Sequence, residues 1–331
     1  MGKRFVASRN IEEPWLKQCP QVIRSCAIRD LKAAFDSNFA KRKINPNHTF
    51  DVKFKAKKDD VTAVRIERVN GAFKVLDDGK HVSFFPKSLK PMGVDPRALQ
   101  GIELKHDITL TKDRLGRFTL HVPYRRENQA AQEPDTWCAI DPGVRTFATV
   151  FSPTDACKIG DGAATRLAKL CAHLDKLTSD TTKASGLQRR RRMKKAQVRV
   201  RNRIVHLVDE LHWQAASFLC KHYTDILLPV FETKKMACRL SRKIGSKTAR
   251  SMLTLSHYKF RMRLIHKAAE HGCRVHLCTE EYTSKTCTRC GALKHNLGGA
   301  KVYRCPVCML RIDRDIAGGR NIFLKNAVAL D

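Results

Sequence analysis

The chain has 331 residues and carries 64 lysines and arginines against 32 aspartates and glutamates, a formal net charge of +32. Its length allows two or three domains around a substantial core. So large an excess of positive charge favours a polyanionic partner, nucleic acid above all. No apolar run approaches the roughly 20 residues of a membrane-spanning helix, and no signal-peptide pattern opens the chain, so we expect no membrane among its partners.

Thirteen cysteines are scattered along the chain. Four of them, Cys138, Cys171, Cys220 and Cys278, stand in apolar surroundings. An odd count in such positions favours buried free thiols in a reducing compartment over a disulfide framework. We therefore expect an intracellular protein, located in the nucleus if the host is eukaryotic and otherwise in the cytoplasm.

The first 134 residues predict two segments. Residues 1–45 are typical of a helical segment that ends at Asn45-Pro46. Residues 46–134 alternate apolar and polar side chains, which predicts a small antiparallel β module in which Leu110 pairs with Leu120. The polar face of this module is rich in lysine, which indicates either a solvated edge or a face that follows phosphates, and the net charge favours the second. The lysines concerned are Lys53, Lys55, Lys57 and Lys58.

Residues 135–331 change to an α/β pattern. Short apolar strands are predicted at 137–140, 146–151, 226–231 and 274–278. Helices are predicted at about 164–177 and 249–270, and from residue 315 onward. This alternation of strands and helices favours a sheet covered by helices.

The most basic stretch of the chain, residues 189–203, leads into a long amphipathic helix. Like charges at this density repel one another unless a polyanion lies along them, which favours phosphate contacts. A nuclear-localisation signal is the other interpretation, and the two are compatible. The residues expected to bind nucleic acid here are Arg189, Arg190, Arg191, Arg192, Lys194, Lys195, Arg199, Arg201 and Arg203.

Two CxxC pairs lie close together in the last quarter of the chain, Cys287 with Cys290 and Cys305 with Cys308. Zn²⁺ favours four soft ligands in a tetrahedron, and each CxxC turn supplies two, so the spacing predicts a zinc ribbon at about residues 283–312. Coincidence in a cysteine-rich chain is the alternative, and the paired spacing argues against it. Zinc ribbons are mostly structural, so this site alone assigns no activity.

Three acidic positions fall at the ends of predicted core elements: Asp141 after a strand, Glu280 or Glu281 after another, and Asp315 at a helix start. Clustered carboxylates repel one another unless cations neutralise them. Two Mg²⁺ ions in such a cluster can activate water and stabilise the leaving oxygen in phosphodiester hydrolysis, so the pattern, with the basic surface, favours a nuclease. The other interpretation is that Asp141 serves only the Pro-Gly turn and that Asp315 only caps its helix.

Three segments, WCAIDPGVRTFATVFSP, YTSKTCTRCG and DRDIAGGRNI, resemble the RuvC-like nuclease core and zinc ribbon of the TnpB proteins of insertion sequences. They resemble the eukaryotic and viral relatives of TnpB, the Fanzor proteins, more closely. The resemblance implies an α/β, RNase H-like (RuvC) nuclease domain over residues 135–331 with the zinc ribbon inserted. It also implies a β-barrel wedge domain over 46–134 and a helical recognition-type segment over 1–45.

The resemblance further implies an RNA-guided DNA endonuclease. A guide RNA of the omega type, made beside the gene, would direct a Mg²⁺-dependent cut in double-stranded DNA. Carried over by motif, Asp141 takes the place of the first metal-binding carboxylate. Asp315, the second acid of DRD, takes the place of the third.

The middle acid departs from TnpB. In TnpB the second motif resembles a strand of the form IIIEDLNVKGM, whereas the corresponding segment of this chain is ILLPVFETKKM. Pro229 stands in place of the glutamate, and Glu232 follows three residues later, beyond the expected strand. Fanzor proteins resemble TnpB with the glutamate moved to the strand before the ribbon. The resemblance therefore implies Glu280, on its ExxTS spacing to Thr283. Glu281 is the fallback, because alternation along a strand lets only one of two neighbours face the site.

Two further departures keep a second hypothesis open. Ala317 replaces the usual asparagine of DRDxN, and Met309 replaces a common glycine after the last CxxC. The first hypothesis is an active endonuclease, and the alternative is a cleavage-deficient, RNA-guided DNA-binding protein that keeps the fold as a transposon-associated remnant. A transposase that itself joins DNA ends ranks last, because the resemblance is to an accessory nuclease.

Overall fold

A computed structural model describes residues 13–50, 52, 59, 61–67, 72–76, 80–85, 91–93, 95, 97, 105–125, 127–129, 136–240, 242, 244–296 and 298–327. The chain forms two compact units, Met1–Arg125 and Arg126–Asp331. The predicted phosphate-following lysines Lys53, Lys55, Lys57 and Lys58 lie outside the described residues. Nowhere in the described ranges is a helix both long and apolar enough to cross a membrane.

The Met1–Arg125 unit combines a long helix with two small antiparallel sheets. Its helices are the short 3₁₀ helix η1 (Pro14–Gln18) and α2 (Gln21–Ile44). One sheet has the order β1-β5-β6, from β1 (Val61–Ile66), β5 (Ile108–Asp113) and β6 (Phe118–His121); the other has the order β2-β3-β4, from β2 (Phe73–Val75), β3 (His81–Phe84) and β4 (Met92–Gly93). Leu110 lies opposite Leu120, as the alternation predicts. Buried side chains from both sheets, Ile66, Phe84 and Ile108 among them, share one core.

A mixed five-stranded sheet forms the centre of the Arg126–Asp331 unit. Its strands are β7 (Trp137–Pro142), β8 (Ala148–Phe151), β9 (Ala156–Ile159), β10 (Asp225–Pro229) and β11 (Arg274–Cys278), in the order β11-β10-β7-β8-β9. The first three in this order run parallel, whereas β8 and β9 are antiparallel additions at the other side. This is the RNase H-like arrangement that the resemblance implies. The apolar run of β10 is buried throughout because other strands pair with it on both sides.

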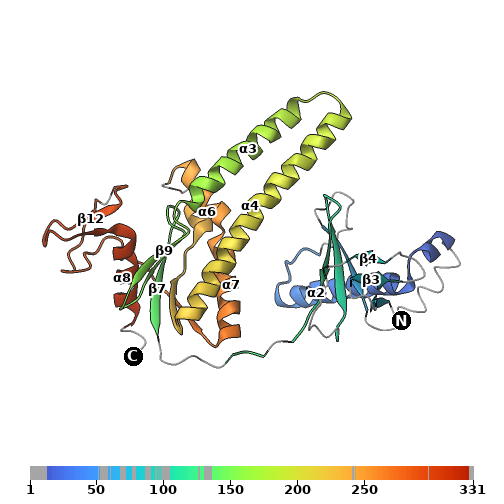
Figure 1. Ribbon diagram of the computed structural model, residues 1–331, viewed down its shortest axis with the longest axis horizontal. Coiled ribbons are helices and arrows are strands. Elements are labelled where there is room, and N and C mark those ends of the chain that lie inside the picture. Colours follow the sequence, from blue (N-terminus) through green and yellow to red (C-terminus); the bar gives the residue numbers. More distant parts are fainter. Residues whose placement is uncertain are drawn as a thin grey trace. The chain divides into compact units, whose positions relative to one another are not determined.

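Helices cover both faces of this sheet (Figure 1). The helices of this unit are α3 (Ala163–Lys183), α4 (Leu187–His222), α5 (Thr233–Ala237), α6 (Ser246–Leu255), α7 (His257–His271) and α8 (Arg314–Ala327). Successive residues of a strand point to opposite faces. On β7, Cys138 and Ile140 therefore pack with α4 and α7, whereas Ala139 packs with Ile322 of α8.

Two helices differ from their predicted extents. The single helix predicted at about 249–270 is divided into α6 and α7 by Ser256, which adopts a left-handed conformation with φ of 50°. The helix predicted at about 164–177 continues to Lys183, and α3 and α4 form an antiparallel hairpin that projects beyond the sheet in Figure 1. Residues 189–203 belong to the first half of α4, near the tip of that hairpin.

Candidate active site and zinc ribbon

A cavity of about 420 Å³ lies at the carboxyl end of the sheet and is lined by Asp141, Glu280 and Asp315. Asp141 is the fifth of the six residues of β7, Glu280 follows β11, and Asp315 is in the first turn of α8. β7 and β11 run parallel on either side of β10, so their carboxyl ends meet at one edge of the sheet. The structure thus brings together three carboxylates that are far apart in the sequence. We call this cavity the acidic pocket.

Two glycines allow Asp141 to occupy its position. A Cβ atom on Gly318 of α8 would overlap the Asp141 carboxylate. A Cβ atom on Gly143 would lie 2.7 Å from the Thr146 carbonyl oxygen, in the turn that the Gly143 N–H closes onto Phe147 O. Only glycine lets the backbone approach so closely. The role of Gly318 is invisible in the sequence, because its partner lies 177 positions away.

Electrostatics in the acidic pocket oppose simultaneous ionisation of its carboxyl groups. Burial, followed by the charges of Glu280 and Asp315, raises the pKa of Asp141 to about 7. Burial also raises the pKa of Glu280 above its ordinary value. A bound cation would reverse both effects, and carboxylate oxygens are the ligands that Mg²⁺ prefers. The donor set therefore fits magnesium.

A second group of polar residues surrounds Asp315. Lys158 of β9 donates to Asp313 Oδ2 at 2.6 Å and lies 4.0 Å from Asp315 Oδ2. Burial alone would raise the pKa of Asp313, but the hydrogen bond and charge of Lys158, together with the backbone N–H groups of Ile316 and Asp315, outweigh it and lower the pKa. Thr146 Oγ1 lies 3.0 Å from Asp161 Oδ1 and 3.4 Å from Asp315 Oδ2. Sequence reasoning missed these residues, and only Asp313, the first acid of DRD, carried a signal.

The segment after β11 presents Glu280 to the acidic pocket and leaves Glu281 exposed and outside its lining. The Thr283 hydroxyl and N–H both donate to the Glu280 carbonyl, at 2.7 and 3.2 Å, which explains the ExxTS spacing as a turn. The buried Asn321 amide of α8 then donates to the carbonyls of Thr283 and Thr286. Asn321 thereby ties this turn to the helix that carries Asp315.

The structure separates the two other candidate positions from the acidic pocket. Pro229 is the last residue of β10, and it is buried and lies beside Cys278 of β11. Glu232 follows the strand, its side chain is 51% exposed, and it pairs with Lys235 at 2.7 Å. Neither residue lines the acidic pocket. Ala317 is buried in α8, in the turn between Asp315 and Asn321.

Four sulfur atoms form a compact cluster in the ribbon. Sγ of Cys287 lies 3.5 Å from Sγ of Cys308, and Sγ of Cys290 lies 3.6 Å from Sγ of Cys305. Four thiolates at the Zn–S distance of about 2.3 Å would stand roughly 3.8 Å apart, so the cluster fits a tetrahedral zinc ion. Among the described residues, this is the one group of three or more metal-binding side chains whose donor atoms all lie within 4.8 Å of one another. The predicted zinc ribbon is confirmed as a Cys₄ cluster.

The ribbon is built from a short hairpin and is tied to the acidic pocket. β12 (Val302–Arg304) pairs with β13 (Arg311–Asp313), and backbone N–H groups of Cys308 and Val307 point at Cys305 Sγ, which lowers the pKa of that thiol to about 6. Arg145 and Arg314, which line the acidic pocket, donate to the carbonyls of Gly299 and Gly298 in the ribbon. Met309, at the usual glycine position, has a positive φ of 58°.

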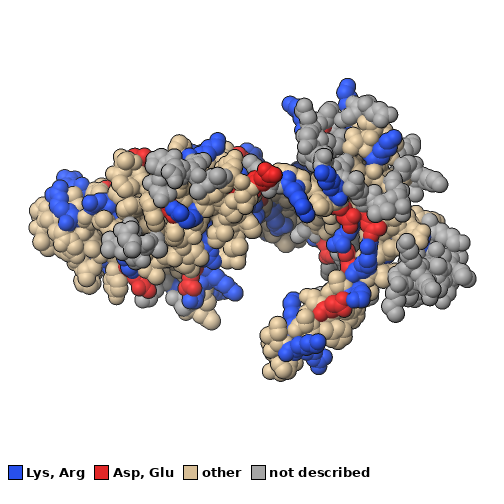
Figure 2. Space-filling view, turned by 90° about the horizontal axis from the view of Figure 1, so that it is seen from below, with Lys and Arg blue, Asp and Glu red and all other residues tan. Residues whose placement is uncertain are grey.

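The nine predicted basic residues of α4 are all exposed. None has a carboxylate partner among the described residues, although Arg190 donates to the Ala184 carbonyl. Figure 2 shows that lysine and arginine side chains are spread over the visible face rather than gathered in one patch. The first half of α4 nevertheless carries these nine exposed charges without carboxylate partners among the described residues, and we call them the basic stripe.

Comparison with known proteins identifies the family. Residues 257–322 match the model of the Cas12f1-like TNB domain. The chain is 32% identical to a putative transposase, A625R, of Paramecium bursaria Chlorella virus 1, over 94% of this chain and 70% of that protein. It is 26% identical to a TnpB-like protein, L79, of Acanthamoeba polyphaga mimivirus, over 72% of this chain and 45% of that protein. The chain belongs to the TnpB family of RNA-guided nucleases.

A solved structure supports the fold of this TnpB-family chain. In the cryo-EM structure of a Cas12f1–sgRNA–target DNA complex, the protein matches 91% of this chain and 71% of its own length, with 15% identity and a TM-score of 0.53. At that identity the likeness concerns the fold alone. The chain spans about half the length of the mimivirus relative.

Proposed function

We propose that this TnpB-family chain is an RNA-guided DNA endonuclease whose RuvC-like site is formed by Asp141, Glu280 and Asp315. In this proposal residues 1–45 are the recognition-type segment, 46–134 the wedge domain and 135–331 the nuclease domain. The partners would be a guide RNA of the omega type and double-stranded DNA. The basic stripe on α4 would contact their phosphates.

The observation that carries the proposal is the origin of the second carboxylate. The neighbouring strand β10 ends in Pro229, which has no metal-binding group, and the acidic pocket is completed by Glu280 from the adjacent strand. The turn closed by Thr283 and Asn321 holds Glu280 at this edge. If Pro229 had simply abolished the site, a second carboxylate at the same edge of the sheet would not be expected.

Asp141, Glu280 and Asp315 would hold two Mg²⁺ ions, which supply an activated water and charge stabilisation for phosphodiester hydrolysis. The residues of the chain have separate tasks. Gly318 keeps room for Asp141, Asn321 orients the turn after Glu280, and Lys158 holds Asp313 beside Asp315. Zinc would have a structural role, fixing the ribbon loop that Arg145 and Arg314 join to the acidic pocket.

The test is cleavage of DNA matched to the RNA that co-purifies with the protein. Single changes Asp141→Ala, Glu280→Ala and Asp315→Ala should each lower the cleavage rate by roughly two to three orders of magnitude and leave guide-directed DNA binding intact. Glu281→Ala and Glu232→Ala are matched controls, because each removes a nearby carboxylate outside the acidic pocket. Cleavage that survives all three changes combined would sink the assignment.

The second candidate is a cleavage-deficient, RNA-guided DNA-binding protein. It is favoured by Ala317, which places a methyl group where relatives have an amide beside the metal-binding acids. It predicts guide-directed binding with no cleavage by the wild type at any divalent-ion concentration. Restoration of cleavage by Ala317→Asn would then identify the missing amide as the cause.

A further inference from the structure

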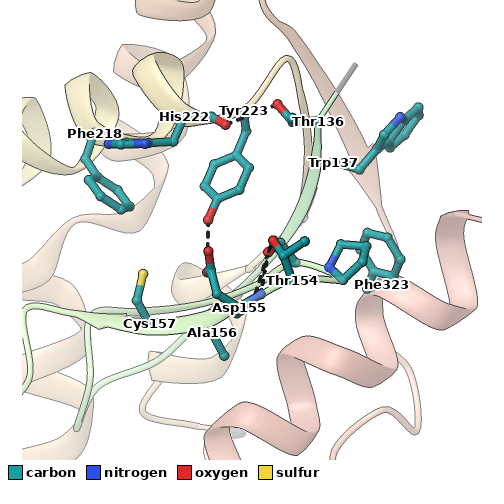
Figure 3. Close-up of a pocket in the computed structure, with 12 residues that line it drawn as sticks. Thr136, Trp137, Thr154, Asp155, Ala156, Cys157, Phe218, His222, Tyr223 and Phe323 are labelled. Atoms are coloured by element: carbon teal, nitrogen blue, oxygen red, sulfur yellow. Dashed lines mark hydrogen bonds between the residues drawn. The ribbon is translucent and has the colours of Figure 1, made fainter. Parts of the chain in front are cut away.

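A second cavity, of about 710 Å³, lies at the opposite end of the same strand from the acidic pocket (Figure 3). Residues 136–137 at the start of β7, the β8–β9 turn at 152–157, the end of α4 and Phe323 of α8 line it. Trp137 and Asp141 stand four positions apart on β7, about 13 Å along the strand. The two cavities share no lining residue. We call this one the aromatic pocket.

Aromatic rings form the walls of this cavity. Phe218 and His222 lie on successive turns of α4, with ring centroids 4.6 Å apart. The side chain of Tyr223 extends from the end of α4 toward Asp155 in the β8–β9 turn (Figure 3). Trp137 is fixed by stacking on His276 at 5.4 Å. Such rings offer stacking surface for a flat ligand, and stacking on aromatic side chains is worth a substantial part of the affinity in single-strand binding.

The floor of the aromatic pocket accepts hydrogen bonds. The exposed Asp155 carboxylate receives the Tyr223 hydroxyl at Oδ1, at 3.4 Å, and Oδ2 has no hydrogen-bond partner among the described residues. Burial raises the pKa of Tyr223 to about 12, so that hydroxyl stays protonated and remains a donor. No lysine or arginine lines the cavity. A carboxylate without a neighbouring cation repels a phosphate group and accepts N–H donors, and the aromatic walls suit a flat ligand, so a flat group with N–H donors fits this cavity best.

Guanine fits these requirements better than the other bases. Its N1–H and N2–H₂ are adjacent donors that match the two oxygens of one carboxylate. Adenine and cytosine place a ring acceptor beside their single amino group, and uracil and thymine place carbonyls on both sides of their N–H. An ionised carboxylate accepts from all of its lone pairs and would repel those neighbouring acceptors.

An arginine side chain of a protein partner has a similar flat shape and similar donors. The charge of the chain argues against it, because a basic partner would approach a protein of net charge +32. A nucleic acid brings a neutral base on an anionic backbone, which the surroundings attract. The aromatic pocket also lies at the end of α4, the helix whose first half carries the nine exposed basic residues, and Lys221 stands exposed beside His222.

We propose that the aromatic pocket binds an unpaired guanine base of a bound nucleic acid strand, stacked on Phe218, His222 and Tyr223 and hydrogen-bonded to Asp155. The base would come from the guide RNA or from an unwound DNA strand, so this inference rests on the proposed function. It adds a site for base recognition on the nuclease domain, at the end of the sheet opposite the acidic pocket. The strand would enter from α4.

The experiment measures the affinity of the full chain for nine-nucleotide RNA strands, all uridine except for a central guanine, adenine, cytosine or uridine, by fluorescence anisotropy without added magnesium. The wild type should prefer the guanine strand by about tenfold or more, the discrimination typical of one bidentate base contact. Asp155→Asn should abolish that preference and leave the all-uridine affinity unchanged. Asp180→Asn, which removes an exposed carboxylate from α3, is the matched control and should retain the preference.

A DNA series of the same design shows which kind of strand carries the base. Guanosine monophosphate tests whether the ligand is a free nucleotide rather than a base within a strand. Much weaker binding of the mononucleotide than of the guanine strand supports the strand, and equally tight binding overturns the proposal. Equal affinity of the wild type for all four strands, or binding of an arginine peptide through Asp155 in place of guanine, overturns the proposal. Failure to bind any strand would instead contradict the proposed function, so the two failures are distinguishable.

Discussion

The Cys₄ cluster and the acidic pocket are both candidate metal sites, and they are built in opposite ways. The four thiols come from two local turns and already stand within 4.8 Å of one another. The carboxylates come from β7, from the segment after β11 and from α8, and they do not form a group of that kind among the described residues. One site depends on short-range geometry, and the other on the packing of a whole sheet.

This difference predicts how each site fails. A ribbon of about 30 residues has little apolar core of its own, with Tyr303, Cys287 and Cys305 buried, so it depends on its metal for stability. The acidic pocket depends on close approach between α8 and β7, which is held by buried apolar contacts of Ala139 and Leu227 with Ile322. Damage to the ribbon should therefore be structural, and damage to the acidic pocket should be mainly catalytic.

The largest effect should come from Cys305→Ser. Loss of one thiolate breaks the tetrahedral set, so the zinc content should fall from about one ion per chain toward zero and the ribbon should unfold. Metal analysis and thermal unfolding would measure both. Cys238→Ser, at an exposed cysteine outside the cluster, is the matched control. Full zinc content and unchanged stability in the Cys305 variant would contradict the structural role.

Gly318→Ala should have the next largest effect. The added methyl group would overlap the Asp141 carboxylate. Overpacking of this kind typically lowers the free energy of unfolding by about 1–3 kcal/mol or displaces the neighbouring side chain, here Asp141. Cleavage should fall at least tenfold while zinc content stays unchanged, which separates the acidic pocket from the ribbon. Gly319→Ala, at the next position of the same helix, makes the same change in helix propensity, and its Cβ atom would lie 3.3 Å from Phe151 Cβ rather than against Asp141, so it is the matched control. Wild-type cleavage by the Gly318 variant would show that Asp141 can move freely.

Two buried histidines should make the Arg126–Asp331 unit less stable in acid. Burial lowers the pKa of His212 and His257 to about 4 each, against 6.5 in the unfolded chain. Between these values the unfolded state binds more protons, so stability present above pH 6.5 is lost as the pH falls, by about 2 kcal/mol per histidine at pH 5. Urea unfolding of the wild type and of the His257→Phe variant at pH 7.5 and pH 5 isolates the histidine contribution, because protonation of Asp141, whose pKa is raised, shifts stability in the opposite direction in both proteins. His257→Phe, which retains a ring against Phe147, should reduce the pH dependence.

The smallest effect should come from the basic stripe. Replacing Arg191 and Arg192 by glutamine should leave folding unchanged and reduce the slope of log affinity against log salt by about 0.7–0.9 for each phosphate that the variant no longer neutralises. The double change Lys169→Gln and Lys176→Gln, on exposed positions of α3, removes the same charge elsewhere on the hairpin. Identical salt slopes in both variants would remove the case for a specific phosphate contact on α4.

Much of the fold was predictable because its signals are local. Alternation and apolar runs placed β7, β10 and β11 close to their observed positions, and β11 matched its predicted range. The division of the 249–270 helix at Ser256 was missed, because apolar periodicity continues through the break. The two helices that Ser256 separates pack against different neighbours, α6 against α3 and α5 and α7 against α4, and no local pattern encodes these contacts.

From the sequence alone came the net charge, the four cysteines of the Cys₄ cluster and three acidic candidates at the ends of core elements. These features depend on composition and on spacings within one or two turns. Only the tertiary structure decided that Glu280 rather than Glu281 faces the acidic pocket, that Gly318 makes room for Asp141, and that a ring of aromatic side chains surrounds Asp155 at the other end of the sheet. Each of these depends on side chains from distant elements that meet only when the sheet and its helices pack.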